Sequence, residues 1–426
     1  MILMIVTQKN KIRGLSKIEF KILKRMCHES KALYNTSLYY INNYFDINDE
    51  YLGYDEMAFI LKTNEHYKML YAACSQQILK VVDREFRSFF HVIKERKKGN
   101  YNRVVKTPKY LPKDSLFLLI YPSQKLKIND GKMFIPLSKK MRKETCKKGI
   151  TIKVPNYITT EMLCEVRIAY RYNHFEIEFI YEKQEKYYKF DENKILTIDV
   201  GLDNLLTNVD CISGRSFIID GRELKSYNRW YNKRVAKYQS IVNKQNITKR
   251  TKWLKALDGK RYWFINDYLN QCVNKIIKYC LENKIGTIVI GENKEWKQGI
   301  NIGKRNNQNF MSIPHGILKY KIKCKCEFHG IKYITQEESY TSKCSFLDDE
   351  SIEKHEYYLG KRITRGLFKS SEGILLNADV NGALNICRKS KQKINNNNQL
   401  CIGLSSSPVR VRVHSIPSRT KNYVIY

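Results

Sequence analysis

The stretch ILTIDVGLDNLLTNVDCISGRSFIIDG, residues 195–221, decides the fold of the C-terminal half of the chain. It divides into three short apolar runs, ILTID, NLLTNVD and SFIIDG, which are joined by tight connections. Short runs rich in β-branched and aromatic residues, bounded by turn residues, are typical of strands. The stretch therefore predicts three consecutive antiparallel strands.

Helix and strand patterns alternate after this stretch. Apolar residues at helical spacing predict helices over 224–246, 251–283, 315–329 and 378–389. The strands TIVIG and IKYITQ lie between them. Three antiparallel strands followed by alternating helix and strand is the order of an RNase H-like α/β core.

The N-terminal half has a different pattern. Within residues 16–99, apolar spacing predicts helices over 16–44 and about 68–97, and Gly99 ends the second after a basic last turn. The segments MFIPL, EVRIAYRY and FEIEFIY alternate apolar and polar residues as strands do. We therefore expect a β-barrel module of residues 1–15 and 100–188 that carries a helical insert. The predicted fold class is α/β plus β-barrel.

The charge of the chain points to a nucleic-acid partner. Its 426 residues include 77 Lys and Arg against 42 Asp and Glu, a net charge of +35. This excess is the electrostatic signature of a protein that binds phosphate backbones. No apolar run reaches 18 residues, so no membrane partner is expected. The 12 cysteines show no disulfide rhythm, which predicts reduced thiols and a cytoplasmic protein, associated with the nucleoid when bound to DNA.

Three carboxylates stand where separate elements could bring them together. Asp199 ends ILTID, Glu292 ends TIVIGE, and Asp379 opens the last helix within NADVNGALNI. Alone, each has an ordinary interpretation: a turn residue, a solvated loop carboxylate, or a helix N-terminal charge. Together on a basic chain they predict a site for Mg²⁺ or Mn²⁺ that cleaves phosphodiesters. Glu337 and Glu338 follow the next strand and are alternatives to Glu292.

Several sequence motifs resemble those of a known family. They are IDVGLDN, IDGRELKSYNRWYNKRVAKYQS, VIGENKEWKQG, EESYTSKCSFLDDESIEKHEYYLGKRITRGLFKSS and NADVNGALNI. In these motifs the chain resembles the TnpB family of transposon-encoded, RNA-guided DNA endonucleases, which are related to compact type V CRISPR effectors. The resemblance extends more weakly through SQQILKVVDREFRSFF and TPKYLPK.

The resemblance implies a domain plan and a set of partners. It implies a wedge-like β module, a helical recognition insert, and a RuvC-type nuclease domain of residues 189–343 and 374–390. The nuclease triad then falls on Asp199, Glu292 and Asp379. The expected partners are a guide RNA and double-stranded target DNA with a short adjacent motif, and we expect a monomer.

Three other functions stay open at this point. A repressor guided by RNA would bind DNA without cutting, but it should lack a triad carboxylate. A transposase would need a module that binds its element's ends, and none is evident. A CRISPR effector would differ only in the origin of its guide.

Residues 344–373 depart from the family's pattern. Many relatives carry two Cys-x-x-Cys pairs there, but this segment holds only Cys344 and, as an isolated histidine, His355. Cys324 and Cys326 lie on the preceding helix. Structural zinc needs four well-spaced ligands, so we predict a degenerate ribbon without zinc.

The last segment, residues 391–426, contains an Asn run, prolines and scattered arginines. It shows no apolar periodicity, which predicts a flexible basic tail. Arg410, Arg412 and Arg419 are candidates for contacts with guide RNA.

Overall fold

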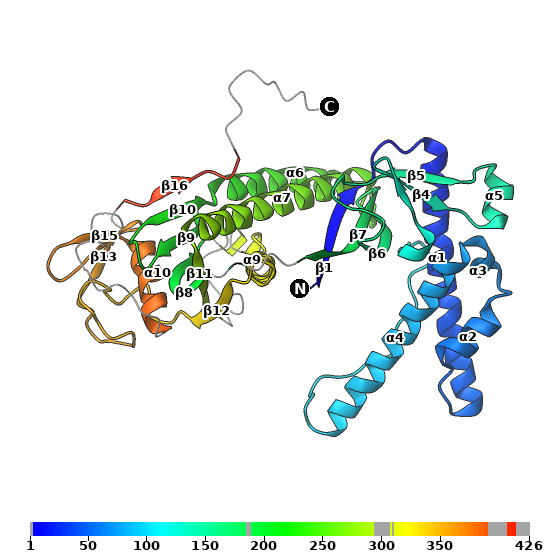
Figure 1. The fold of residues 1–426 in the computed structure, drawn as a ribbon, viewed down its shortest axis with the longest axis horizontal. Coiled ribbons are helices and arrows are strands. Elements are labelled where there is room, and N and C mark those ends of the chain that lie inside the picture. The colour runs from blue at the N-terminus through cyan, green and yellow to red at the C-terminus, as the bar shows by residue number, and fades with distance from the viewer. Residues whose placement is uncertain are drawn as a thin grey trace, which may run out of the picture. The chain divides into compact units, whose positions relative to one another are not determined.

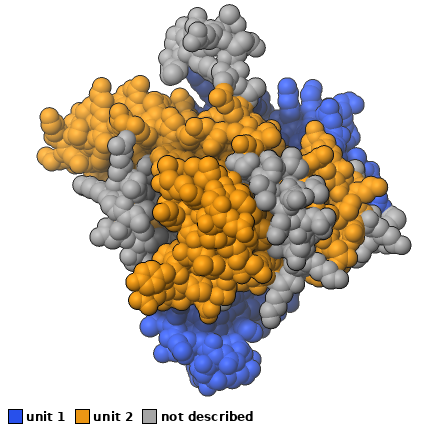
Figure 2. Space-filling view, turned by 90° about the vertical axis from the view of Figure 1, so that its left-hand side faces the viewer, with its two compact units in different colours: residues 1–184 blue, residues 185–426 orange. Residues whose placement is uncertain are grey.

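The computed structural model describes residues 3–184, 188, 190–293, 307–308, 311–390 and 407–414. The chain divides into two compact units, Met1–Gln184 and Glu185–Tyr426, which Figure 2 draws in different colours. Each unit is treated separately below. No helix within the described ranges is both long and apolar enough to cross a membrane.

Four helices of unit 1 lie within the predicted insert of residues 16–99 (Figure 1). They are α1 (Lys17–Asn48), α2 (Tyr54–Leu61), α3 (Glu65–Met69) and α4 (Ala72–Lys97). A capping box begins α1: the Ser16 hydroxyl accepts from the Glu19 amide at 3.2 Å, and the Glu19 carboxylate accepts from the Ser16 amide at 2.9 Å.

The strands of unit 1 form two antiparallel sheets. The larger sheet has the order β1-β7-β6-β2, and the smaller has the order β3-β4-β5. Their bounds are β1 (Leu3–Lys11), β2 (Leu119–Pro122), β3 (Ile128–Asn129), β4 (Lys132–Pro136), β5 (Gly149–Lys153), β6 (Leu163–Arg171) and β7 (His174–Gln184), with α5 (Lys139–Thr145) between β4 and β5.

This arrangement of two sheets differs from the predicted barrel. Among the described residues of unit 1 the strands do not close into a barrel, because β1 and β2 remain opposite edges of the larger sheet. Buried residues of α1 and α4 share one core with Tyr121 and Val166 from this sheet. Helices therefore cover the apolar face that a barrel would have enclosed.

The main sheet of unit 2 has the order β12-β11-β8-β9-β10-β16. Strands β8, β9 and β10 pair antiparallel, whereas β8, β11 and β12 pair parallel. Their bounds are β8 (Asp191–Val200), β9 (Asn204–Asp210), β10 (Ser216–Asp220), β11 (Ile285–Glu292), β12 (Lys332–Glu337) and β16 (Val409–Val411). The strand order predicted from the sequence for residues 195–337 is thus observed.

Helices cover both faces of this sheet. The helices of unit 2 are α6 (Arg222–Lys244), α7 (Lys252–Asn283), α9 (His315–His329) and α10 (Ala378–Lys389). Ile198 of β8 and Ile290 of β11 share a buried cluster with residues of α7 and α9. Ile195 and Val289 pack instead with Ile386 of α10. Since neighbouring strand residues point to opposite faces, the odd-numbered positions of β8 and β11 face α10.

A small antiparallel sheet leads into α10. Its strands are β13 (Lys361–Thr364), β14 (Leu367–Lys369) and β15 (Leu375–Asn377), in the order β13-β14-β15. The expected flexible tail contains a strand, because β16 pairs parallel with the edge of β10. Residues 391–406 and 415–426, including Arg419, lie outside the described residues.

Candidate metal centre

Asp199 lies near the end of β8 on the face covered by α10. A Cβ atom built on Gly382 of α10 would stand 3.2 Å from Asp199 Oδ2, so a glycine lets the helix approach the carboxyl group. Burial among surrounding atoms, together with the negative charges of Asp379 and Glu338, raises the pKa of Asp199 to about 8. The structure therefore gathers acidic side chains at this point without enough positive charge to balance them.

Asp379 occupies the first turn of α10. The side chain of Asn377 caps the helix by accepting from the amides of Asp379 at 3.0 Å and Val380 at 3.2 Å. The Asp379 carboxylate accepts two hydrogen bonds, from Asn204 Nδ2 at 2.6 Å and from Arg362 Nη2 at 2.8 Å. Both carboxylate oxygens are therefore engaged in this conformation.

Glu338 follows β12 and reaches back across β11. Its Oε2 atom would lie 2.4 Å from a Cβ atom built on Gly291, so the missing side chain there makes room for the carboxylate. Burial raises the pKa of Glu338; the charge of Glu337 adds to this, whereas the charge of Lys319 opposes it. Gly291 faces α10, which places the Glu338 carboxylate on the same side of the sheet as Asp199.

Glu292 is next to Gly291 on β11 and so points to the other face. Its charge acts on Lys319 of α9 and on Tyr333 of β12. Glu338 is among the groups whose charge raises the pKa of Asp199. The structure thus brings Asp199 and Asp379 together on the face where Glu338 also lies, while Glu292 follows Gly291 at the next strand position.

Glu337, the other alternative, is held away from this group. Its carboxylate accepts from Lys389 Nζ and from the amide of Ser339. The hydrogen bond from Lys389 is the main reason that the pKa of Glu337 falls to about 2, and Ser339 adds to it. Glu337 therefore serves to tie the end of β12 to α10.

Lys319 supplies a cation beside the carboxylates. Its ammonium group donates to the carbonyl of Gly291. Burial lowers the pKa of Lys319, against the charges of Glu338, Glu292 and Asp199, which all raise it. This amine therefore lies close enough to sense all three acidic groups.

The donor set suits a hard divalent cation. In the described ranges no three His, Cys, Asp or Glu side chains are already arranged to hold a metal. Hydrogen bonds to Asn204 and Arg362 occupy Asp379 in this conformation. Carboxylate oxygens with excess negative charge are nevertheless the ligands that Mg²⁺ and Mn²⁺ prefer. The residues fit such an ion if Arg362 gives up its bond to Asp379.

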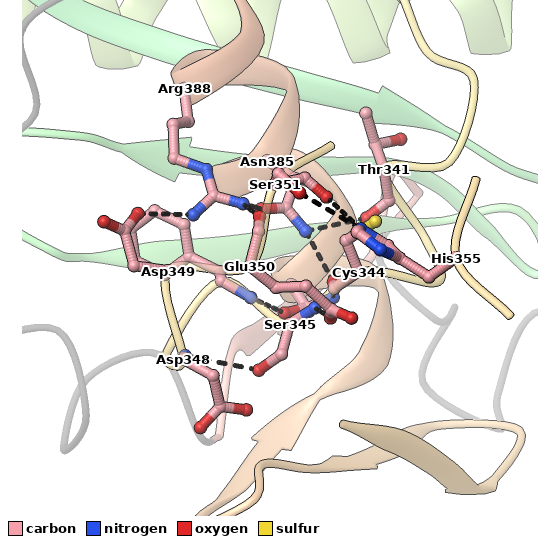
Figure 3. A network of polar contacts seen from close by, with 12 residues as sticks. Thr341, Cys344, Ser345, Asp348, Asp349, Glu350, Ser351, His355, Asn385 and Arg388 are labelled. Atoms are coloured by element: carbon pink, nitrogen blue, oxygen red, sulfur yellow. Dashed lines mark hydrogen bonds and ion pairs between the residues drawn. The ribbon is translucent and has the colours of Figure 1, made fainter. Parts of the chain in front are cut away.

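Hydrogen bonds organise residues 341–359, where a zinc ribbon would have metal ligands (Figure 3). The Glu350 carboxylate is buried and accepts from the amides of Ser345 at 2.6 Å and Leu359 at 2.9 Å. Cys344 is buried and donates to the Glu353 carbonyl at 3.6 Å, while His355 contacts the Ser351 carbonyl at 2.7 Å. The Glu350 carboxylate thus holds together two backbone positions of this segment.

Polar residues of α10 hold this segment against the sheet. Asn381 and Asn385 are fully buried, and both donate to the Cys344 carbonyl, at 2.9 and 2.7 Å. Arg388 pairs with Asp349 at 2.6 Å, as Figure 3 shows. This ion pair is a second contact between α10 and the segment. The motif NADVNGALNI therefore contains Asn381 and Asn385, which hold the structure together, as well as Asp379.

Sequence reasoning missed two residues that touch Asp379. Asn204 is the last residue of the motif IDVGLDN, and Arg362 lies in the long motif that ends at Ser371. Both motifs carry the family resemblance, but neither residue type by itself indicates a role. Only their position within these motifs could have indicated a role at the site, because an isolated Asn or Arg is common on a basic chain.

Comparisons with known proteins agree with this architecture. A family model described as probable transposase, OrfB_IS605, matches residues 178–297, and a Cas12f1-like TNB domain model matches residues 315–386. A TnpB-like protein, ORF457, of Acidianus two-tailed virus is 28% identical over 208 residues, which are 46% of this chain and 42% of that protein. The aligned part therefore spans less than half of the viral relative.

The structural comparison covers more of the chain. The Cas12f1–sgRNA–target DNA complex contains a chain that matches with a TM-score of 0.56 and 15% sequence identity. The match covers 88% of this chain and 83% of that one. The fold is thus shared with the Cas12f1 chain of that complex. The sequence matches make the chain similar to a probable transposase family and to a TnpB-like viral protein over parts of its length.

Proposed function

We propose that this chain is an RNA-guided DNA endonuclease with an RNase H-like, RuvC-type nuclease domain. The observation that carries the proposal is the gathering of Asp199, Glu338 and Asp379 on one face of the sheet of unit 2. They come from three elements, β8, the end of β12 and the start of α10. The strand order and directions of this sheet are those of an RNase H-like core.

In this proposal the middle ligand is Glu338, and Glu292 is the alternative. Asp199, Glu338 and Asp379 would hold Mg²⁺ or Mn²⁺. When bound, such an ion lowers the pKa of a water molecule and stabilises the charge of the leaving oxygen. The protein's own part is to hold the three carboxylates in place on rigid elements.

Two cations at the site have separate roles. Arg362 carries a planar fork that suits a phosphate oxygen pair, so we assign it to the scissile phosphate once it leaves Asp379. Lys319 is fixed by the Gly291 carbonyl and offsets the charge of the carboxylates from the α9 side.

The proposed partners are a guide RNA and double-stranded target DNA next to a short motif. The net charge of +35 supports a phosphate-rich partner. The matching Cas12f1 chain was solved with sgRNA and target DNA. Retention of all three carboxylates is our reason to prefer cleavage over repression. The match to a probable transposase model supports an origin in a mobile element.

A cleavage assay with the guide-loaded protein tests the proposal. Asp199→Ala and Asp379→Ala should each abolish cutting in Mg²⁺ while RNA-dependent DNA binding stays nearly unchanged, because each removes a metal ligand and no phosphate contact. Asp46→Ala, an exposed carboxylate on α1, is the matched control and should cut normally. Full cleavage by either site variant would overturn the assignment.

A further inference from the structure

A row of hydrogen bonds links the tail strand β16 to the metal centre. Arg410 of β16 donates from Nη2 to Asn204 Oδ1 at 2.8 Å. Asn204 in turn donates from Nδ2 to Asp379 Oδ2 at 2.6 Å. A residue expected only in a flexible tail is therefore two hydrogen bonds away from a proposed metal ligand.

The chemistry of this row fixes the orientation of Asn204. A guanidinium group can only donate hydrogen bonds, and an ionised carboxylate can only accept them. An asparagine amide between them satisfies both only when its oxygen faces Arg410 and its nitrogen faces Asp379. Without Arg410, the Asn204 oxygen would lose its donor, and only the bond to the carboxylate would hold the amide in place.

Arg410 is itself held in place by the fold. It pairs with Ile218 in the parallel register of β16 on β10. Its other terminal nitrogen lies 3.6 Å from the carboxylate of Asp220, which is buried at the end of β10. Three residues further on, Val413 is buried in the core of unit 2. The guanidinium group is thus positioned by strand pairing, an ion pair and a buried side chain.

We propose that Arg410 is a positioning residue for the metal centre, acting on Asp379 through Asn204. The inference rests on the proposed function, since it gives Asp379 the part of a metal ligand. Hydrogen-bond partners of metal ligands set the ligand's orientation, and losing one costs about 10–100-fold in metal affinity or activity. Arg410 is one bond further away, so its loss should cost less, roughly 3–10-fold in metal affinity.

Metal binding is the measurement, made on the full chain without RNA because RNA phosphates bind cations. Mn²⁺ titrations followed by electron paramagnetic resonance give the dissociation constant without any need for cleavage. Arg410→Gln should raise this constant by about 3–10-fold. Arg410→Lys keeps a group that only donates and should stay within about threefold of the wild type. Arg412→Gln, an exposed arginine next on the tail, is the matched control and should bind Mn²⁺ normally.

A double-mutant comparison separates positioning from a general loss of structure. In an Asn204→Ala background, Arg410→Gln should have no further effect on Mn²⁺ binding, because the group through which it acts is gone. A further loss in that background would overturn the inference. So would wild-type binding by Arg410→Gln, or an equal loss in Arg410→Lys.

Asp379→Ala distinguishes this inference from the proposed function. If Asp379→Ala leaves Mn²⁺ binding unchanged, the metal centre itself is wrong and the inference falls with it. If Asp379→Ala abolishes binding but Arg410→Gln does not weaken it, only the role of Arg410 is overturned.

Discussion

The Glu338 carboxylate occupies the space that a side chain at Gly291 would fill: a Cβ atom there would lie 2.4 Å from Glu338 Oε2. This relationship places an acidic group that follows β12 over the end of β11, beside Asp199. It also separates Glu338 from Glu292, which points to the opposite face of β11.

The first prediction compares these two glutamates. Glu338→Gln should reduce guided DNA cleavage in Mg²⁺ by at least about 100-fold, the upper end of the loss expected for disturbing a metal site. Glu292→Gln should keep cleavage within about threefold of the wild type, because its side chain lies on the other face. Single-turnover rates measure both. Normal cutting by Glu338→Gln together with an inactive Glu292→Gln would restore Glu292 as the middle ligand.

A second prediction uses the space at Gly291. Gly291→Ala places a methyl group 2.4 Å from Glu338 Oε2 and 2.9 Å from the Ile386 side chain. Turning the flexible Glu338 carboxylate aside relieves most of this clash, so cleavage should fall at least about tenfold, as for a disturbed ligand orientation. RNA-dependent DNA binding should persist.

The control for this change lies on α9. A Cβ atom on Gly316 meets nothing within 4 Å, so Gly316→Ala should cut at the wild-type rate. Gly291→Ala with full activity would show that Glu338 does not need its present position.

The third prediction concerns zinc. Glu350, Asn381 and Asn385 organise the segment around Cys344 through hydrogen bonds. Purified protein should therefore contain well under one equivalent of zinc, and a zinc chelator should leave its melting temperature unchanged in Mg²⁺-free buffer. Elemental analysis and thermal unfolding make the measurement. One tightly held zinc per chain would refute the metal-free ribbon.

Glu350 gives a fourth prediction. Hydrogen bonds to a charged group contribute about 1.5–3 kcal/mol, and Glu350 is only 5% exposed. Glu350→Gln replaces one carboxylate oxygen by a donor that faces a backbone amide, which should lower the unfolding midpoint by about 3–10 °C. Glu353→Gln, an exposed neighbour, should change it little. Equal midpoints for the two variants would contradict the role given to Glu350.

The fifth prediction concerns pH and the metal-free protein. The pKa of Asp199 is about 8 in the fold, against an ordinary aspartate value of 3.8. Between these values the native state holds a proton that the unfolded state has lost, so stability falls as pH rises from about 4 to about 8. Asp199→Asn cannot ionise and escapes this loss. In EDTA its melting temperature should exceed that of the wild type, by a margin that grows towards pH 8.

A lower limit can be given for this difference in melting temperature between Asp199→Asn and the wild type. A change of about 1 kcal/mol moves the midpoint of a domain of this size by about 2–4 °C, and we expect at least that at pH 8. Glu372→Gln, an exposed carboxylate, should show no such pH trend. A constant margin between pH 5 and pH 8 would mean that Asp199 is already ionised throughout.

Parts of the fold followed directly from the sequence. The helix predicted over 251–283 is observed as Lys252–Asn283, and the one over 378–389 as Ala378–Lys389. These helices have long apolar patterns, and an Asn or Thr cap marks where each begins. Local chemistry therefore sets their ends.

The middle ligand could not be assigned in the same way. Strand β11 is buried on both faces, so TIVIGE reads as a continuous apolar run and its alternation cannot be seen. Only the packing of Ile290 and Val289 against different helices shows which way Glu292 points. The barrel was wrong for a related reason: alternation predicts a strand but not what covers its apolar face.

The pairing of β16 with β10 matters to anyone who shortens this chain or fuses cargo to it. Trimming before Val409 would uncover the edge of β10, whose open N–H and C=O groups are a template for aggregation. His414 still contacts Glu223 at 2.6 Å, so it belongs with the folded part. Cargo such as a fluorescent label is best joined after His414, where it leaves β16 paired with β10.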